Sequence, residues 1–111
     1  MKKEVSFDGI GQVTATFTAQ EGVEVGMPVK IAANGEVAPC AAGDPLNAVA
    51  VAVKNGCAAV QVAGFVRCKA TGLSVGTVKL SADGSGGVKQ DEGGSPFLVV
   101  ETDSESATVL L

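Results

Sequence analysis

The sequence predicts a mainly β fold: a small single-domain β-barrel or sandwich built from short antiparallel hairpins, with little or no helix. The chain has 111 residues, a length that allows one domain around one modest core. Short strand-like segments alternate along it with turn signals made of Gly, Pro, Asn-Gly and Asp-Gly. No long segment shows the apolar periodicity of an amphipathic helix. These three observations favour closely spaced strands, which suits a barrel or sandwich.

The clearest predicted strand covers residues 13–18. Its apolar side chains fall on one face and its threonines on the other: Val13, Ala15 and Phe17 against Thr14, Thr16 and Thr18. Threonine suits the exposed face of a pleated, half-buried strand. We expect the residues before it, 1–11, to form an N-terminal arm that is flexible in the free protein, and residues 12–111 to form the single β domain.

Two Asn-Gly pairs predict tight hairpins. Asn34-Gly35 joins strands at 28–33 and 36–38, and Asn55-Gly56 joins strands at 48–54 and 57–63. Both central residues of a type I′ turn need positive φ, which Asn and Gly tolerate best. A regular hairpin with a two-residue loop at 55–56 would place Val53 opposite Ala58, Val51 opposite Val60, and Val49 opposite Val62.

This register would place the valines of the second hairpin on one buried face. The opposite face would carry smaller side chains, and it could approach either another layer or another subunit. Gly64 would then kink the chain before a strand at 65–69 that directs Phe65, Arg67 and Lys69 to one side. The candidate subunit-interface residues are Ala50, Ala52, Ala59, Gln61, Phe65 and Arg67.

Further strands are predicted at 78–80, 88–90, 97–101 and 107–111. Two segments echo each other: Gly22-Val23-Glu24-Val25-Gly26 precedes Val29-Lys30-Ile31, and Gly72-Leu73-Ser74-Val75-Gly76 precedes Val78-Lys79-Leu80. The echo has two interpretations, related halves of the chain or a recurrent way of leading into a barrel strand. We favour the second.

Composition argues against several function classes. The chain has no His, the commonest general base and metal ligand, and its three cysteines lack metal-site spacing. We therefore predict no catalytic residues, no metal, no cofactor and no small-molecule substrate. Cys40, Cys57 and Cys68 are expected to be reduced and buried. The aspartates beside Gly, Pro or Ser are expected to cap turns.

The net charge of −4 argues against nucleic acid or an anionic membrane as a partner, because both favour a clustered basic surface. The longest apolar run, residues 46–53, is far shorter than a membrane helix requires. The N-terminus has lysines but lacks the apolar stretch of a secretory signal. The protein is therefore expected to stay in the compartment where it is made.

Residues 22–90 resemble the small head-decoration proteins of tailed bacteriophages, the capsid-cementing group that includes the lambda head-decoration protein. The resemblance lies in the order of several segments: Val25-Gly26-Met27-Pro28-Val29-Lys30-Ile31, then Asn34-Gly35-Glu36-Val37-Ala38, the turn Ala42-Gly43-Asp44-Pro45, the strand 48–53, the stretch 59–70, and Gly72 to Gly76.

The resemblance implies a non-catalytic phage or prophage structural protein. It would stabilise the head by binding the major capsid protein, as a homotrimer on the capsid surface of a virion, after synthesis in the bacterial cytoplasm. The family's N-terminal arm commonly contacts the capsid. The corresponding capsid-contact residues here would be Lys2, Lys3, Val5, Phe7 and Ile10. The alternatives are another virion assembly component, such as a head fibre or tail protein, and a small-ligand- or carbohydrate-binding β-barrel.

Overall fold

The computed structural model describes residues 11–111, and its regular structure in that range is entirely β-strand. The strands are β1 (Val13–Ala19), β2 (Pro28–Ala33), β3 (Glu36–Pro39), β4 (Ala48–Lys54), β5 (Cys57–Ala63), β6 (Phe65–Ala70), β7 (Gly76–Ala82), β8 (Gly87–Gln90), β9 (Ser95–Thr102) and β10 (Ser106–Leu110). Each predicted strand segment is confirmed, and so is the mainly β fold class.

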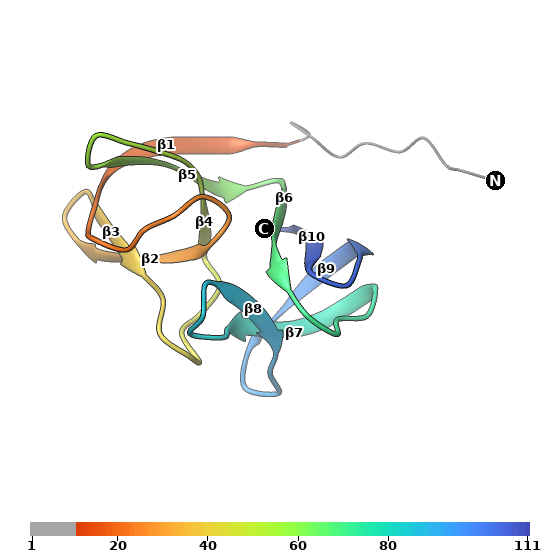
Figure 1. The fold of residues 1–111 in the computed structure, drawn as a ribbon. Coiled ribbons are helices and arrows are strands. Elements are labelled where there is room, and N and C mark those ends of the chain that lie inside the picture. Colours follow the sequence, from red (N-terminus) through yellow and green to blue (C-terminus); the bar gives the residue numbers. More distant parts are fainter. Residues whose placement is uncertain (1–10) are drawn as a thin grey trace.

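The strands close into two barrels, each built from one continuous half of the chain (Figure 1). The order around the first is β1-β3-β2-β4-β5, and around the second β10-β6-β8-β7-β9. In both barrels the first strand pairs in parallel with the third and antiparallel with the fifth. All other pairs are antiparallel. The two halves therefore share one topology, strand for strand.

This shared topology corrects our interpretation of the sequence echo. The repeated turns at residues 22–26 and 72–76 both lead from the first strand of a barrel to its second strand. Since all five strands of each half connect and pair alike, the repeat extends over whole barrels and supports related halves. The echo is clearest at these turns because glycine is needed there: Gly22, Gly26, Gly72 and Gly76 all have positive φ.

The two Asn-Gly turns differ. Asn55 and Gly56 have φ of 52° and 77°, so both central residues are left-handed, as a type I′ turn needs. At the other turn only Gly35 has positive φ, at 68°. The strands beside that turn shift register between Ile31 and Ala33, so this hairpin forms without the predicted type I′ geometry.

A β-bulge in β4 changes the predicted faces of the second hairpin. Near the turn Val53 pairs with Ala58, as the sequence indicates. The register then shifts between Ala50 and Ala52, so that Ala50, instead of Val51, pairs with Val60. One extra residue on one strand exchanges the two faces beyond it, because side chains alternate along a strand.

The predicted valine face and small-residue face were therefore partly wrong. Val53 and Val62 are 37% and 41% exposed, although we expected them to be buried. Ala50 and Gln61, assigned to the accessible face, are 0% and 2% exposed. Val49 is buried as expected, but it lies in the core of the second barrel.

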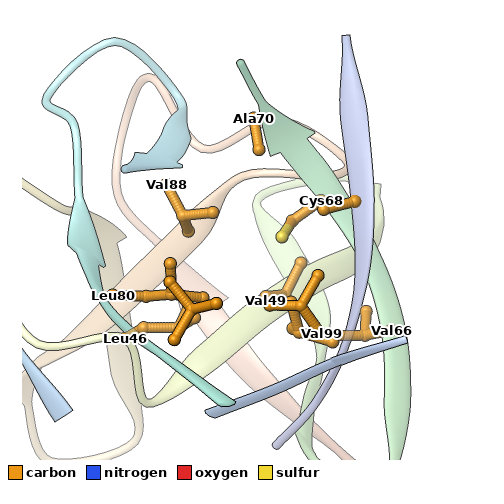
Figure 2. Close-up of a cluster of buried hydrophobic side chains, with 11 residues drawn as sticks. Leu46, Val49, Val66, Cys68, Ala70, Leu80, Val88 and Val99 are labelled. Carbon is orange, nitrogen blue, oxygen red and sulfur yellow. The ribbon is translucent and has the colours of Figure 1, made fainter. Parts of the chain in front are cut away.

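Two hydrophobic clusters form the core. The first lies inside the first barrel and consists of Val23, Val29, Val37, Ala48, Ala50, Ala58 and Val60. The second lies inside the second barrel and contains Val66, Cys68, Ala70, Val78, Leu80, Val88, Val99, Ala107 and Val109, together with Leu46 and Val49 (Figure 2). Leu46 and Val49 come from the first half of the chain, so the second barrel is completed by the first.

Backbone contacts support the same junction. The Gly43 N–H donates to the Ala82 carbonyl at 2.9 Å, and the Ala82 N–H donates to the Asp44 carbonyl at 2.9 Å. Pro45 forms an isolated antiparallel bridge with Ser81. The segment that leads into β4 is thereby fixed to β7, which places Leu46 in the second core.

The chain passes from one barrel to the other at a sharp bend around Gly64, which confirms the predicted kink. Gly64 has a φ of +91°, and a Cβ atom there would lie 2.6 Å from the Gly11 carbonyl carbon. Gln61 holds the bend from inside, since its side-chain amide donates to the carbonyls of Ala63 at 3.0 Å and Phe65 at 2.8 Å. Burying this amide is tolerated because its donors are satisfied.

Replacing Asn55 with valine should destabilise the β4–β5 turn by about 1–2 kcal/mol, because a β-branched residue resists positive φ. Urea denaturation of the purified protein measures the change. Asn55→Gly, which keeps the left-handed conformation accessible, is the matched control and should cost less. Equal stability of Asn55→Val and the unmodified protein would contradict the type I′ geometry.

Replacing Leu46 with alanine should lower the free energy of unfolding by about 2–5 kcal/mol, because it leaves a cavity in a closed core. Val75→Ala, at an exposed position, should change stability by no more than about 0.5 kcal/mol. Denaturation followed by circular dichroism compares the two variants. A small effect at Leu46 would mean that the second barrel does not depend on the first.

Candidate interaction surfaces

The residues predicted to contact a capsid lie outside the described part of the chain. Lys2, Lys3, Val5, Phe7 and Ile10 all precede residue 11, where the description begins. The arm predicted over residues 1–11 falls almost entirely in the same range. Gly11 itself lies against Gly64 in the bend between β5 and β6. The described chain thus starts next to the junction of the two barrels.

The predicted subunit-interface residues divide into two groups. Ala50 and Gln61 are buried inside the protein, so their assignment to a surface was wrong. The β4 bulge turns Ala50 inward, whereas Gln61 is buried at the Gly64 bend, where the Ala63 and Phe65 carbonyls accept its amide. The other four remain accessible, with Ala52 and Arg67 exposed and Ala59 and Phe65 half-buried. Phe65, Arg67 and Lys69 share one side of β6, as predicted, while Val66, Cys68 and Ala70 face the core.

An open groove of about 820 Å³ runs along β6, between the β1–β2 connection of the first barrel and the β9–β10 turn of the second. Its charged lining residues are Glu24, Arg67, Lys69, Asp103 and Glu105. Both signs of charge are therefore present along its walls. Neither a cation nor an anion would meet a surface of uniform opposite charge there.

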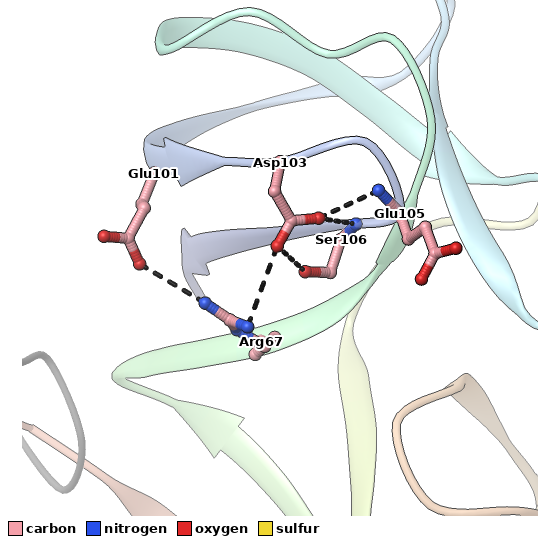
Figure 3. A network of polar contacts seen from close by, with 5 residues as sticks. All are labelled: Arg67, Glu101, Asp103, Glu105 and Ser106. Carbon is pink, nitrogen blue, oxygen red and sulfur yellow. Dashed lines mark hydrogen bonds and ion pairs between the residues drawn. The ribbon is translucent and has the colours of Figure 1, made fainter.

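Arg67 is the centre of a small ionic network in this groove (Figure 3). Its Nη2 atom lies 3.4 Å from Glu101 Oε1, and its Nη1 atom lies 3.9 Å from Asp103 Oδ2. All three side chains are roughly half exposed, so solvent screens both pairs and each contributes little to stability. The network orients Arg67 across β6, β9 and the adjoining turn.

Asp103 organises the β9–β10 turn. Its Oδ1 atom accepts the backbone N–H groups of Glu105 and Ser106, each at 2.8 Å, and its Oδ2 atom accepts the Ser106 hydroxyl at 3.1 Å. These bonds, the one from the Glu105 N–H foremost, hold the pKa of the Asp103 carboxyl below its ordinary value. Asp103 therefore acts as a turn cap, as the sequence indicates.

Other aspartates have the same role. Asp44 accepts the Ala41 N–H at 2.8 Å, and that bond lowers its pKa, with Lys30 adding to the effect. Asp91 accepts the Gly93 N–H of its own turn at 2.9 Å, and the Ser81 hydroxyl, which it accepts at 2.6 Å, is the first cause of its lowered pKa. The turn chemistry predicted for these residues is confirmed.

The cysteines are partly as predicted. Burial raises the pKa of the Cys40 thiol to about 11 and that of the Cys68 thiol to about 12. Cys57 is exposed, contrary to expectation, because it follows the Asn55-Gly56 turn at the outer end of the hairpin. Among residues 11–111, no group of three or more Cys, Asp or Glu side chains could hold a metal ion.

Sequence reasoning missed three exposed apolar side chains that matter below. Leu98 and Leu110 are cross-strand neighbours on β9 and β10, and Ile31 lies on β2. The alternation of apolar and polar residues does not identify them, because their exposure depends on how the two barrels pack in the folded protein. The only sequence signal is the echo, which places Ile31 and Leu80 at corresponding positions although one is exposed and the other buried.

Comparison with known proteins adds no relative: no protein-family model matches the sequence, and no curated protein matches it. Within the described residues, no helix is long and apolar enough to cross a membrane.

Replacing Asp103 with alanine should lower the free energy of unfolding at neutral pH. It should also reduce the amount of stability that the protein loses in acid. A carboxyl whose pKa is lowered by folding stabilises the native state above its ordinary pKa of 3.8, and this contribution is lost as the pH falls through the folded-state value. Urea denaturation at pH 7 and pH 3 measures both effects, with Ser104→Ala in the same turn as control. An unchanged loss of stability in acid would contradict the capping role.

Proposed function

We propose that this chain is a structural protein of a tailed bacteriophage or prophage that decorates and stabilises the capsid through protein–protein contacts. The major capsid protein of the head is its partner, and it acts without catalysis as a homotrimer on the virion surface after synthesis in the bacterial cytoplasm. The resemblance of residues 22–90 to the head-decoration family supports this role. A small, strand-only body also agrees with it.

The observation that carries the proposal is the number of apolar side chains directed outward from both barrels. Val25, Ile31, Leu98 and Leu110 are between 36% and 64% exposed. Leu98 and Leu110 are also cross-strand neighbours, and adjoining exposed apolar side chains are typical of protein–protein contact sites. Phe65 and Arg67, on the accessible side of β6, remain candidate contact residues.

A second candidate is a small-ligand- or carbohydrate-binding barrel, which the groove beside Arg67 favours. The groove is open, and the Arg67 guanidinium already faces the carboxylates of Glu101 and Asp103. A ligand there would have to compete with these ion pairs. A head fibre or tail component remains the alternative within virion assembly, and it would lack affinity for mature heads.

Co-sedimentation with capsids tests the proposal. Purified protein is mixed with expanded heads of the phage or prophage that encodes the chain, and separately with unexpanded procapsids of the same phage. Saturable binding to expanded heads, with little to procapsids, is the expected result. Absence of binding to expanded heads would overturn the decoration role and favour the other assembly components.

Deleting residues 1–10 should weaken binding to expanded heads at least tenfold, equivalent to about 1.4 kcal/mol, if Val5, Phe7 and the two lysines contact the capsid. Gly11 is kept because it lies against Gly64. The melting temperature should change little, since strands within residues 13–110 close both barrels. Unchanged head binding would rule the arm out as a contact, and a large fall in melting temperature would make it part of the folded body.

A further inference from the structure

Strand register defines corresponding positions in the two barrels. The pairs β1–β3, β1–β5, β2–β4 and β4–β5 of the first barrel have counterparts in the second with corresponding residues opposite one another. The remaining pair differs in register, since Ile31 lies opposite Val37 whereas Leu80 lies opposite Gln90. The corresponding ranges are 14–19 and 65–70, 28–31 and 77–80, 48–52 and 97–101, and 57–62 and 106–111. Even the bulge repeats, since the register shifts at Val51 in one barrel and at Val100 in the other.

Within the chain, the first barrel attaches to the second through Leu46 and the Gly43–Pro45 turn, and through the side chains of Val49 and Gln61. Leu46 and the turn lie outside the corresponding ranges, whereas Val49 and Gln61 lie within them and are opposite one another on β4 and β5. Val49 is fully buried in the core cluster of the second barrel (Figure 2). Gln61 reaches from β5 to the Phe65 carbonyl at the start of β6. We call this pair the docking pair of the first barrel.

The corresponding pair in the second barrel is exposed and more apolar. Val49 corresponds to Leu98 and Gln61 to Leu110, which are opposite one another on β9 and β10. Leu98 is 42% exposed and Leu110 is 36% exposed. Two adjoining leucines thus occupy the position at which the first barrel contacts the second. We call them the docking pair of the second barrel, and both are partly exposed.

The surface that receives the docking pair is repeated too. In the second barrel Val49 shares its buried cluster with Val66, Cys68 and Leu80. The corresponding residues of the first barrel are Ala15, Phe17 and Ile31, which we call the receiving face. Ala15 is exposed, Phe17 is half-buried and Ile31 is 59% exposed. The core cluster of the first barrel contains no residue of the second barrel.

Within residues 11–111, the ladder between β1 and β3 covers only the end of β1. The Thr18 N–H donates to the Gly35 carbonyl at 2.9 Å, so the even-numbered residues of β1 direct their N–H groups toward β3. Thr14 and Thr16 face the same way, but the ladder with β3 covers only Thr18 and Ala19 among the described residues. Residues 12–18 carry no charge and no proline, the usual protections of an edge strand.

In the second barrel the first barrel lies beside the corresponding edge. The edge around Phe65 and Arg67 borders an open hollow of about 250 Å³, which Val25, Ala50 and Val51 of the first barrel also line. The chain therefore shows a five-stranded barrel next to this kind of edge.

We propose that a second copy of this chain docks its Leu98–Leu110 pair on the Ala15–Phe17–Ile31 face of the first barrel, repeating between molecules the contact that joins the two barrels within one. The contact is head-to-tail, because each copy offers one docking pair and one receiving face. Such heterologous contacts close into rings or continue as open chains. The inference requires no capsid, so its failure leaves the proposed decoration role to be judged by head binding alone.

Light scattering on three single variants tests the contact. Leu98→Glu removes the docking pair, Ile31→Glu removes the receiving face, and Val75→Glu is the matched control at an exposed valine outside both surfaces. The unmodified protein should form multiples of the 11.0 kDa chain as its concentration rises. Leu98→Glu and Ile31→Glu should weaken association at least tenfold, whereas Val75→Glu should leave it unchanged.

Mixing the two defective variants tests whether the two surfaces complement one another. Leu98→Glu keeps its receiving face and Ile31→Glu keeps its docking pair, so the mixture should form one complementary contact and a dimer of about 22 kDa, twice 11.0 kDa. The unmodified protein separates the two symmetries: a two-fold contact stops at the dimer, whereas a head-to-tail contact also gives larger multiples.

Circular dichroism and melting curves verify that the variants fold, and Leu98→Ser and Ile31→Ser are milder replacements if either glutamate variant does not. An unmodified protein that stays monomeric at every concentration overturns the inference. So does a folded Leu98 variant with the mass distribution of the unmodified protein, or a mixture without the 22 kDa species.

Discussion

The fold depends on the insertion of Leu46 and Val49 into the hydrophobic core of the second barrel. A five-stranded barrel of this size encloses few side chains, and the parallel pair that closes it here contains only two residue pairs, so one side of the cylinder is incompletely sealed. The first barrel fills that side with two large apolar side chains and fixes them with backbone bonds from the Gly43–Asp44 turn to β7. The two halves have the same topology, but only the second barrel takes core side chains from the other half.

The strands and turns could be predicted from the sequence because they depend on preferences of residues that are close together in the chain. Alternation at residues 13–18 and the Asn55-Gly56 turn reflect side-chain spacing and φ preferences that act within a few residues. The faces of the β4–β5 hairpin could not be predicted in the same way. Val51 is an extra residue on β4, so the register of a regular hairpin does not hold beyond it. Valine is common in regular strands, so the residue type at this position does not indicate a bulge.

The candidate surfaces were harder to predict than the strands, because exposure is a property of the assembled fold. The bulge exchanges the face of Ala50 on β4, and Gln61 on β5 is buried because two carbonyls at the Gly64 bend accept its amide. Leu98, Leu110 and Ile31 are residue types common in cores, so their exposure follows from how the barrels pack and not from residue type. Arg67, by contrast, lies on the predicted side of β6, where strict alternation holds.

The unequal dependence of the two barrels gives the chain a direction of assembly during synthesis. The first core cluster consists only of side chains up to residue 60, so it can close while the second half is still being made. The second cluster needs Leu46 and Val49, which by then are already held at the edge of a finished barrel. The folded first half can thus provide the surface on which the second half folds. The order in which the two halves are translated is the order in which their cores can form.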